Sequence, residues 1–205
     1  MSIEINPIYY YSIDHKMGKA DKRRLSIIQA AIKSMASEGY EGVNFERLSR
    51  KMKIRRSHIV YYFKDRNELV VAMVRYVVAL AQELTVQHLS KKKTIEDKIH
   101  GICEATFLWA DEYREHIQIL VTFYALCGSQ STFRKLNTEL KEVGSARIAE
   151  LLKMYDSKDS AVHIRNKARS IQSTIAGHVI EYIGSNSDLN FQMICLRSID
   201  AILAS

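Results

Sequence analysis

The sequence predicts an all-α fold of about nine helices, and three observations support this fold class. Pro7 is the only proline, so the strongest helix breaker is absent from the rest of the chain. Apolar residues recur every three or four positions along most of the chain, which is the spacing of one helix face. No alternating run of apolar and polar residues is long enough to predict a sheet.

The chain opens with an arm and two helices. Residues 1–20 are predicted to form an N-terminal arm, and a helical pattern begins at Asp21. This first helix ends at Gly39, which supplies a left-handed stop. Asn44 is a cap residue for a short second helix over 45–51.

Seven further helices follow. A tight break near 53–55 precedes a third helix over about 56–62. Asp65 and Glu68 form a D-x-x-E capping box, which predicts a long fourth helix that reaches about residue 89. Polar or glycine-containing breaks then separate five more predicted helices, over about 95–111 (capped by Thr94 and Asp97), 114–127, 131–155, 160–184 and 189–203.

The net charge of +7 is concentrated in one part of the chain. Residues 16–66 hold 14 Lys and Arg against 5 Asp and Glu, whereas residues 67–205 hold 16 of each sign. Such asymmetry predicts a polyanionic partner for the basic segment, either nucleic acid or an anionic membrane surface.

The basic segment has the pattern of a helix-turn-helix. Its second and third helices are short, a tight turn joins them and a longer helix precedes them, so the third helix is expected to enter the DNA major groove. In this helix Ile59 and Phe63 share one face and are expected to pack inward. Arg56 lies at the end that reaches base edges, where its planar fork can bond guanine O6 and N7.

The same segment resembles a known family. Residues 24–69 contain I-x-x-A-A in the first helix, E-G-Y-E-G after it, the Leu48–Ser49 pair, and I-x-Y-Y-F-K-D-R-N-E-L at the end. Together these motifs resemble the DNA-binding domain of the tetracycline-repressor (TetR) family of bacterial regulators. The resemblance implies a helix-turn-helix domain over 21–66 and a helical ligand-binding and dimerisation domain over 67–205.

The resemblance also implies which residues contact DNA. It makes Asn44 a phosphate contact as well as a cap, and it places Arg56, Ser57 and His58 at base-reading positions. Tyr61, Tyr62, Lys64 and Arg66 fall at backbone contacts. The predicted DNA-binding residues are therefore Asn44, Arg55, Arg56, Ser57, His58, Tyr61, Tyr62, Lys64 and Arg66.

This sequence departs from the family pattern at several positions. Lys53 replaces the usual glycine of the turn, so a non-glycine must adopt the turn conformation there. Arg55 replaces the usual Ser or Thr cap of the third helix, the usual small pair is Ser57–His58, and Val60 replaces the first tyrosine. The added cations suit DNA but leave the operator sequence unpredicted. Near the start of the basic segment lie four cations that form either an arm along the minor groove or the phosphates, or a mobile basic tail: Lys19, Lys22, Arg23 and Arg24.

The last two predicted helices are candidate dimerisation surfaces. Helix-turn-helix modules usually read two half-sites as a dimer, and the resemblance implies dimerisation through the last two helices. The predicted interface residues are Ile164, Ala168, Ile171, Ile175, Val179, Ile194, Ile199 and Ile202. Burial of these residues within a single chain is the alternative, and the sequence does not separate the two.

The middle helices are rich in aromatic residues, and the resemblance implies an inducer cavity there. The candidate ligand-pocket residues are Phe107, Trp109, Tyr113, His116, Phe123, Tyr124 and His178. Ordinary core packing is the competing interpretation, because aromatic residues at helical spacing commonly fill cores. Any effector is expected to be a small molecule that shifts the equilibrium between two conformations.

Other function classes lack support in the sequence. No hydrolase, metalloprotease or phosphate-loop motif is present, so no catalytic residue, metal or cofactor is predicted. Cys103, Cys127 and Cys195 lie far apart and are expected to be free thiols. The apolar stretch over 69–81 is interrupted by Arg75 and is too short to cross a membrane, and no secretory signal is found. We therefore expect a cytoplasmic protein with no membrane partner.

These features favour a sequence-specific transcriptional regulator, more a repressor than an activator. It is expected to bind a palindromic operator in double-stranded DNA as a homodimer and to be released by a small-molecule effector. The main alternative is a sequence-independent, nucleoid-associated DNA-binding protein. A basic module for acidic membranes or partner proteins is a further alternative.

Overall fold

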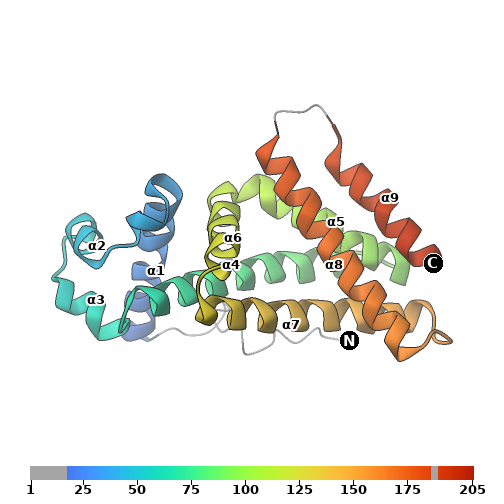
Figure 1. The fold of residues 1–205 in the computed structure, drawn as a ribbon, viewed down its shortest axis with the longest axis horizontal. Coiled ribbons are helices and arrows are strands. Elements are labelled where there is room, and N and C mark those ends of the chain that lie inside the picture. The colour runs from blue at the N-terminus through green and yellow to red at the C-terminus, as the bar shows by residue number, and fades with distance from the viewer. Residues whose placement is uncertain (1–17, 186–188) are drawn as a thin grey trace. The chain divides into compact units, whose positions relative to one another are not determined.

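A computed structural model describes residues 18–185 and 189–205, and within them the chain forms nine α-helices, one short 3-10 turn and no strand (Figure 1). This confirms the predicted fold class. The predicted arm lies outside the described residues as far as residue 17. The elements are α1 (Lys19–Glu38), η2 (Tyr40–Gly42), α2 (Phe45–Met52), α3 (Arg56–Tyr62), α4 (Arg66–Leu89), α5 (Ile95–Glu112), α6 (Arg114–Cys127), α7 (Ser131–Tyr155), α8 (Ala161–Gly184) and α9 (Phe191–Ala204).

Side-chain caps explain why several helices begin where the sequence predicts. The N–H of Asp97 donates to Thr94 Oγ1 over 3.0 Å, and the N–H of Thr94 donates to Asp97 Oδ2 over 3.3 Å, which is a complete capping box at the start of α5. At the start of α4 the N–H of Glu68 donates to Asp65 Oδ1 over 2.9 Å. The Glu68 carboxylate reaches one residue further back than predicted, to the N–H of Lys64.

The chain divides into two compact units. The first contains the residues up to Glu83 and residues 113–136, and thus holds α1 to α3, most of α4, α6 and the start of α7. The second contains residues 84–112 and 137–205. The division therefore runs through two long helices, whereas the sequence suggested a boundary between residues 66 and 67.

The first unit has a core in which α1 packs against η2, α2 and α6. Side chains of α1, α3 and α4 are fully buried in this unit, among them Ile28, Ile59, Leu69 and Met73. The buried face of α4 explains its composition. By length and composition α4 is apolar enough to cross a membrane, with a mean hydropathy of 1.7 over 18 residues, whereas the stretch over 69–81 that the sequence singled out is only part of it. Its apolar residues instead supply the core of this unit.

The second unit is built around α5, α8 and α9. Helices α8 and α9 form a hairpin, and both pack against α5 (Figure 1). Cys103 of α5 and Cys195 of α9 are both fully buried. The interaction with the Cys195 thiol, together with burial, raises the pKa of the Cys103 thiol. The two thiols, far apart in sequence, are thus neighbours in the fold, and both are free.

Candidate nucleic-acid interface

Helix α2 begins at a side-chain cap. Asn44 has an extended backbone, and its Oδ1 accepts hydrogen bonds from the N–H groups of Glu46 and Arg47 over 2.9 and 3.2 Å. These bonds satisfy two of the donors that a helix start leaves without partners. The cap uses the oxygen of the side chain, so the exposed amide nitrogen is the atom that can donate to a phosphate.

The turn between α2 and α3 depends on Lys53. This residue has φ 53° and ψ 42°, the left-handed conformation, and it is the only non-glycine residue with positive φ in the described chain. Its N–H bonds to the carbonyl of Arg50, and the N–H of Ile54 bonds to the carbonyl of Ser49 over 3.0 Å. This pattern closes the helix as glycine usually does. The structure thus confirms that a non-glycine adopts the turn conformation.

Helix α3 has one buried and one exposed side. Ile59 and the following Phe63 are fully buried. The N-cap residue Arg55 forms no side-chain cap, in keeping with the absence of Ser or Thr there. The predicted contact residues at the start of the helix are all exposed, namely Arg55, Arg56, Ser57 and His58. Tyr61 is 81% exposed, and its ring meets that of half-buried Tyr62 edge to face at 5.0 Å.

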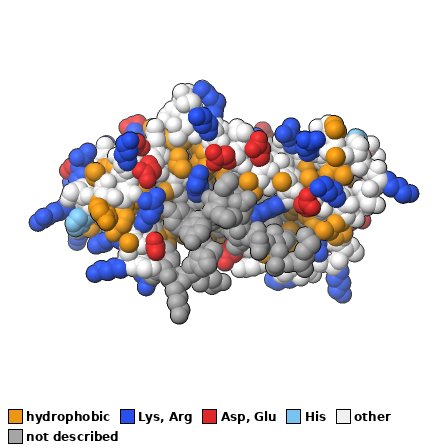
Figure 2. All heavy atoms as spheres, turned by 90° about the horizontal axis from the view of Figure 1, so that it is seen from below, with side chains coloured by type: hydrophobic (Ala, Val, Ile, Leu, Met, Phe, Trp, Pro, Cys, Tyr) orange, Lys and Arg blue, Asp and Glu red, His pale blue; other side chains and the backbone are white. Residues whose placement is uncertain are grey.

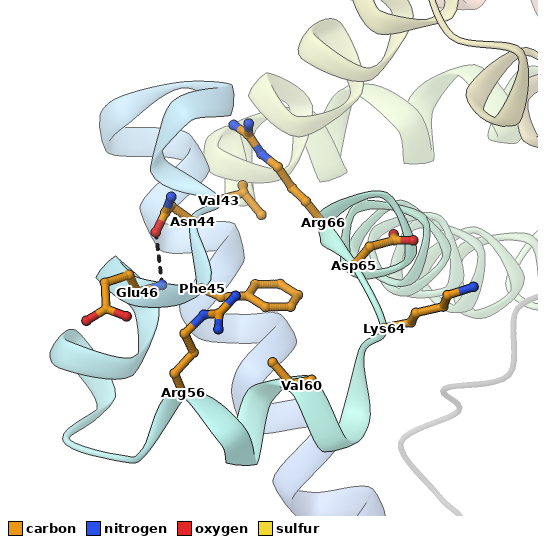
Figure 3. A pocket seen from close by; sticks show the side chains of 9 residues that line it. All are labelled: Val43, Asn44, Phe45, Glu46, Arg56, Val60, Lys64, Asp65 and Arg66. Carbon is orange, nitrogen blue, oxygen red and sulfur yellow. Dashed lines mark hydrogen bonds between the residues drawn. The ribbon is translucent and has the colours of Figure 1, made fainter.

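A cavity of about 520 Å³ opens between the start of α2, the outer side of α3 and the start of α4 (Figure 3). Arg56 extends across it towards Phe45, whereas Lys64 points away from it. Val60, which stands where the family has a tyrosine, also lines it. On the face shown in Figure 2, Lys and Arg side chains project around the region of α2 and α3, with hydrophobic side chains between them. Arg56 and the exposed Lys64 are the cations that this surface can offer to a phosphate backbone, and Glu46 and Asp65 also line the cavity.

Arg66 is the predicted contact residue that the structure places differently. Its Nη2 donates to the carbonyl oxygen of Tyr40, and its guanidinium lies 3.5 Å from the centroid of the Tyr40 ring. Its Nη2 also lies 3.4 Å from the Glu41 carboxylate. The charge of Arg66 is therefore used to hold η2 onto the start of α4. Lys64, by contrast, has an exposed side chain, as expected for a phosphate contact.

Other cations of the segment are paired within the fold. Glu38, at the end of α1, accepts hydrogen bonds from Lys51 and from Arg47 of α2, the latter over 2.9 Å. The Lys51 hydrogen bond is the largest influence that lowers the pKa of Glu38 below its ordinary value, so this carboxylate stays charged. The four cations near the start of the basic segment lie on α1 and not in a separate tail; Lys19, Lys22 and Arg23 are exposed, whereas Arg24 is half-buried.

The predicted ligand-pocket residues fall into both units. Tyr113, His116, Phe123 and Tyr124 belong to the first unit, where Tyr113 and His116 stack at 5.1 Å and Phe123 packs against Phe133. Burial lowers the pKa of His116, which favours its neutral form.

In the second unit Phe107 packs against Tyr182, and the Nδ1 of His178 lies 2.8 Å from the carbonyl of Thr174. Trp109 lines an open groove of about 470 Å³ between the end of α4 and α5, together with Leu108, Asp111 and Glu112. The other six candidates line neither this groove nor the cavity beside α3. A ligand site that contains all seven stays a prediction.

The predicted dimer residues lie mostly inside the second unit. The five on α8 and Ile199 of α9 are at most 5% exposed, because α8 and α9 turn this stripe towards each other and towards α5. A side chain already buried within its own chain cannot supply the surface on which a partner lies. The exposed face of α8 instead carries Ser173, Gly177, Ile180 and Gly184, while Ile194 on α9 is 38% exposed.

Three residues of α5 with metal-binding side chains, His100, Cys103 and Glu104, follow one another at i, i+3 and i+4, and two of them are paired with other side chains. His100 Nε2 lies 2.7 Å from Asp200, and Glu104 Oε2 lies 2.8 Å from His88 Nε2 and also accepts from Lys92. Among the residues that the structure describes, no group of three or more His, Cys, Asp or Glu is arranged to hold a metal ion.

Comparison with known proteins agrees with the helix-turn-helix geometry. The family model described as bacterial regulatory proteins, tetR family, matches residues 27–73. The HTH-type transcriptional regulator BetI of Burkholderia cenocepacia is 24% identical over 162 residues, which cover 78% of this chain and 80% of that protein. BetI of Burkholderia ambifaria is 24% identical over 134 residues, 65% of this chain and 67% of the relative.

Solved structures share the fold over nearly the whole chain. A TetR-family regulator from Cytophaga hutchinsonii superposes with a TM-score of 0.77 at 13% identity, covering 93% of this chain and 97% of its own. A transcriptional regulator from Saccharomonospora viridis, solved in complex with choline, gives a TM-score of 0.73 at 16% identity, with 88% and 95% of the two chains covered. At these identities the match establishes the fold alone.

Proposed function

We propose that this chain, as a member of the TetR family of DNA-binding transcriptional regulators, is a cytoplasmic repressor that binds a palindromic operator. In this proposal a homodimer places one α3 in each of two successive major-groove segments. A small-molecule effector then releases the dimer from DNA. Because the relatives are transcriptional regulators, we assign no catalytic activity to the chain.

The observation that carries the proposal is the two-sided character of α3. Its inner side is anchored by fully buried Ile59 and Phe63, while Arg56, Ser57 and His58 at its start are exposed. Arginine and serine at this end of a recognition helix can bond base edges, and the exposed Tyr61 hydroxyl can donate to a phosphate. Lys64 and Asn44 lie on either side of the cavity beside α3 and supply further donors to the backbone.

The proposed homodimer uses the outward face of α8 and α9. Ser173, Gly177, Ile180 and Gly184 follow one another at helical spacing and are all exposed, so the backbone of a second α8 can approach closely. Nothing lies within 4 Å of the position that a Cβ would take at Gly177. Ile194 of α9 extends the apolar part of this face.

The effector is proposed to be a small cation, and choline is the first compound to test. The S. viridis structural neighbour is in complex with choline. In this chain the open groove beside α5 combines the carboxylates of Asp111 and Glu112 with Trp109 and Leu108, and its lining also includes Lys91 and His88. Carboxylates and aromatic rings both attract quaternary ammonium groups. A thermal shift with choline, and none with an uncharged isostere, is the expected result.

The experiment that tests the function is selection of binding sites from random double-stranded DNA at near-physiological salt. Enrichment of one palindrome with half-sites about one helical turn apart is the expected result. Retention of DNA without any enriched motif, with an affinity that falls steeply with salt, would instead mean sequence-independent binding. The enriched operator then serves as the DNA ligand in affinity measurements on variants.

A further inference from the structure

We propose that Arg24 is a positioning residue for the recognition helix, and not part of a DNA-contacting arm. Arg24 lies on α1, 38 residues before its main partner, and no motif in the sequence connects the two. The inference rests on the proposed function, because it concerns how α3 is held when it reads an operator.

The side chain of Arg24 meets the end of α3 through two contacts. Its Nη1 donates to the carbonyl oxygen of Tyr62 over 2.7 Å, and its guanidinium carbon lies 4.3 Å from the centroid of the Phe63 ring. Tyr62 is the last residue of α3, so this carbonyl is one of those that a helix end leaves without an intrahelical partner. A cation at a helix C-terminus also interacts favourably with the helix dipole.

Arg24 also reaches the start of α4. Its Nη2 lies 3.8 Å from Glu68 Oε1, and the same carboxylate accepts the N–H of Lys64. One guanidinium thus contacts both sides of the short link between α3 and α4. The Arg24 side chain is 31% exposed, so solvent screens the ion pair, and the directed hydrogen bond and the ring contact are the stronger restraints.

The Arg24 contacts matter for the orientation of α3 because few other contacts hold this helix in place. It is seven residues long, and Ile59 is the only residue within it that is fully buried. At 1.5 Å per residue such a helix is roughly 10 Å long, so a tilt of about 10° at its C-terminal end moves its start by about 2 Å. A shift of that size breaks hydrogen bonds to base edges, whose geometry tolerates only a few tenths of an ångström. Holding Tyr62 and Phe63 in place therefore holds Arg56, Ser57 and His58 in register.

The test compares Arg24→Met with Arg23→Met in the full-length protein on the selected operator. Arg23 is the exposed neighbour in the same turn of α1 and carries the same charge. We expect R24M to bind about tenfold more weakly, as for the loss of a hydrogen bond to a charged group. We also expect it to discriminate less between operator variants at the positions that α3 reads, and R23M to keep the wild-type base preference.

The salt dependence of binding separates positioning from direct contact. Each phosphate contact that is lost lowers the slope of log K against log salt by about one. Positioning predicts that R24M keeps the wild-type slope. A slope that falls by about one, with base preference kept, would show that Arg24 contacts a phosphate and would overturn the proposal, as would R24M binding that equals wild type.

Arg24→Lys provides a second variant that retains the charge and does not depend on the folding of R24M. A phosphate contact predicts near-wild-type affinity for R24K. Positioning predicts that R24K remains weakened, because an ammonium lacks the planar fork that bonds Tyr62 while it lies over Phe63. If neither wild type nor R23M binds any operator, the proposed function fails; if both bind and R24K and R24M match them, positioning alone fails.

Discussion

One sequence pattern, an apolar stripe with polar flanks, occurs both in helices α2 and α3 of the first unit and in helices α8 and α9 of the second. The pattern predicted the exposed surface correctly in the first pair but not in the second. Ile59 of α3 and Phe63, which follows this helix, are buried, and the cations at the start of α3 are exposed as predicted. In α8 the stripe from Ile164 to Val179 is also buried within the chain, although it was a candidate dimer surface from the sequence.

The difference shows what an apolar stripe can and cannot predict. Hydrophobic spacing predicts that a face is buried, because exposure of Ile and Phe to water costs free energy. It does not predict whether the covering surface belongs to the same chain. Charged residues are more informative here, since an unpaired charge is rarely buried. Arg56 could thus be placed on the surface from sequence, whereas the dimer surface had to be found as the faces of α8 and α9 that remain exposed.

The largest expected effect comes from the buried stripe of α8. Ile171 is fully buried, so Ile171→Ala removes packing that the surrounding helices cannot fully restore. We expect the free energy of unfolding to fall by about 2–5 kcal/mol, measured by urea denaturation. Under conditions in which I171A is folded, this variant should retain the wild-type dimer dissociation constant. If I171A stays as stable as wild type but no longer dimerises, the buried stripe of α8 would be part of the dimer interface after all.

A charge on the opposite, exposed face of α8 should weaken dimerisation and leave the stability of the monomer nearly unchanged. Ile180 is 43% exposed, and Ile180→Arg places a cation where the proposed partner helix lies. We expect dimer affinity to weaken by about 2 kcal/mol or more, as at a central interface position, with little change in stability of the monomer. Sedimentation equilibrium measures the dimer. Val121→Arg is the matched control, since Val121 of α6 is 42% exposed and lies outside this face; an equal loss of dimer in both variants would contradict the assigned face.

The base-reading end of α3 provides the next effect. Arg56→Ala removes the guanidinium that extends over the cavity, and we expect a loss of about 1–3 kcal/mol in operator affinity together with relaxed preference at one base position. Lys64→Ala should weaken binding evenly across sequences and reduce the salt slope by about one, because a phosphate contact carries no base information. Fluorescence anisotropy on a panel of operator variants measures both. If R56A behaves as K64A does, then Arg56 contacts the backbone and not a base.

The sequence predicted the helices more fully than the contacts between them. Caps such as Asn44 and the Thr94–Asp97 box are local, so the helix boundaries could be placed to within about two residues. The turn η2 was missed because it is only three residues long. The inward roles of Arg24 and Arg66 were missed for a different reason. Their partners, Tyr62 and Tyr40, are 38 and 26 residues away, and nothing in a basic side chain distinguishes a charge for DNA from a charge for a carbonyl oxygen.

The smallest effect concerns Lys53 in the turn between α2 and α3. Its backbone strain lowers the stability of the protein, whereas its charge is expected to favour DNA binding. Lys53 adopts a left-handed conformation that costs a residue with a Cβ roughly 1 kcal/mol relative to glycine. Lys53→Gly removes this strain but gives the unfolded chain more conformational freedom, so the net gain in unfolding free energy should be about 0.5 kcal/mol. Thermal denaturation measures this gain.

The same substitution removes an exposed cation from the basic segment. If Lys53 serves DNA, K53G should be the more stable protein and the weaker binder, with a shallower salt slope. Lys53→Gln keeps the strain and removes the charge, so it should share the binding loss without the gain in stability. Unchanged binding in both variants would mean that the charge of Lys53 does not contribute to operator binding, and that the charge excess of the first unit overstates its contact with DNA.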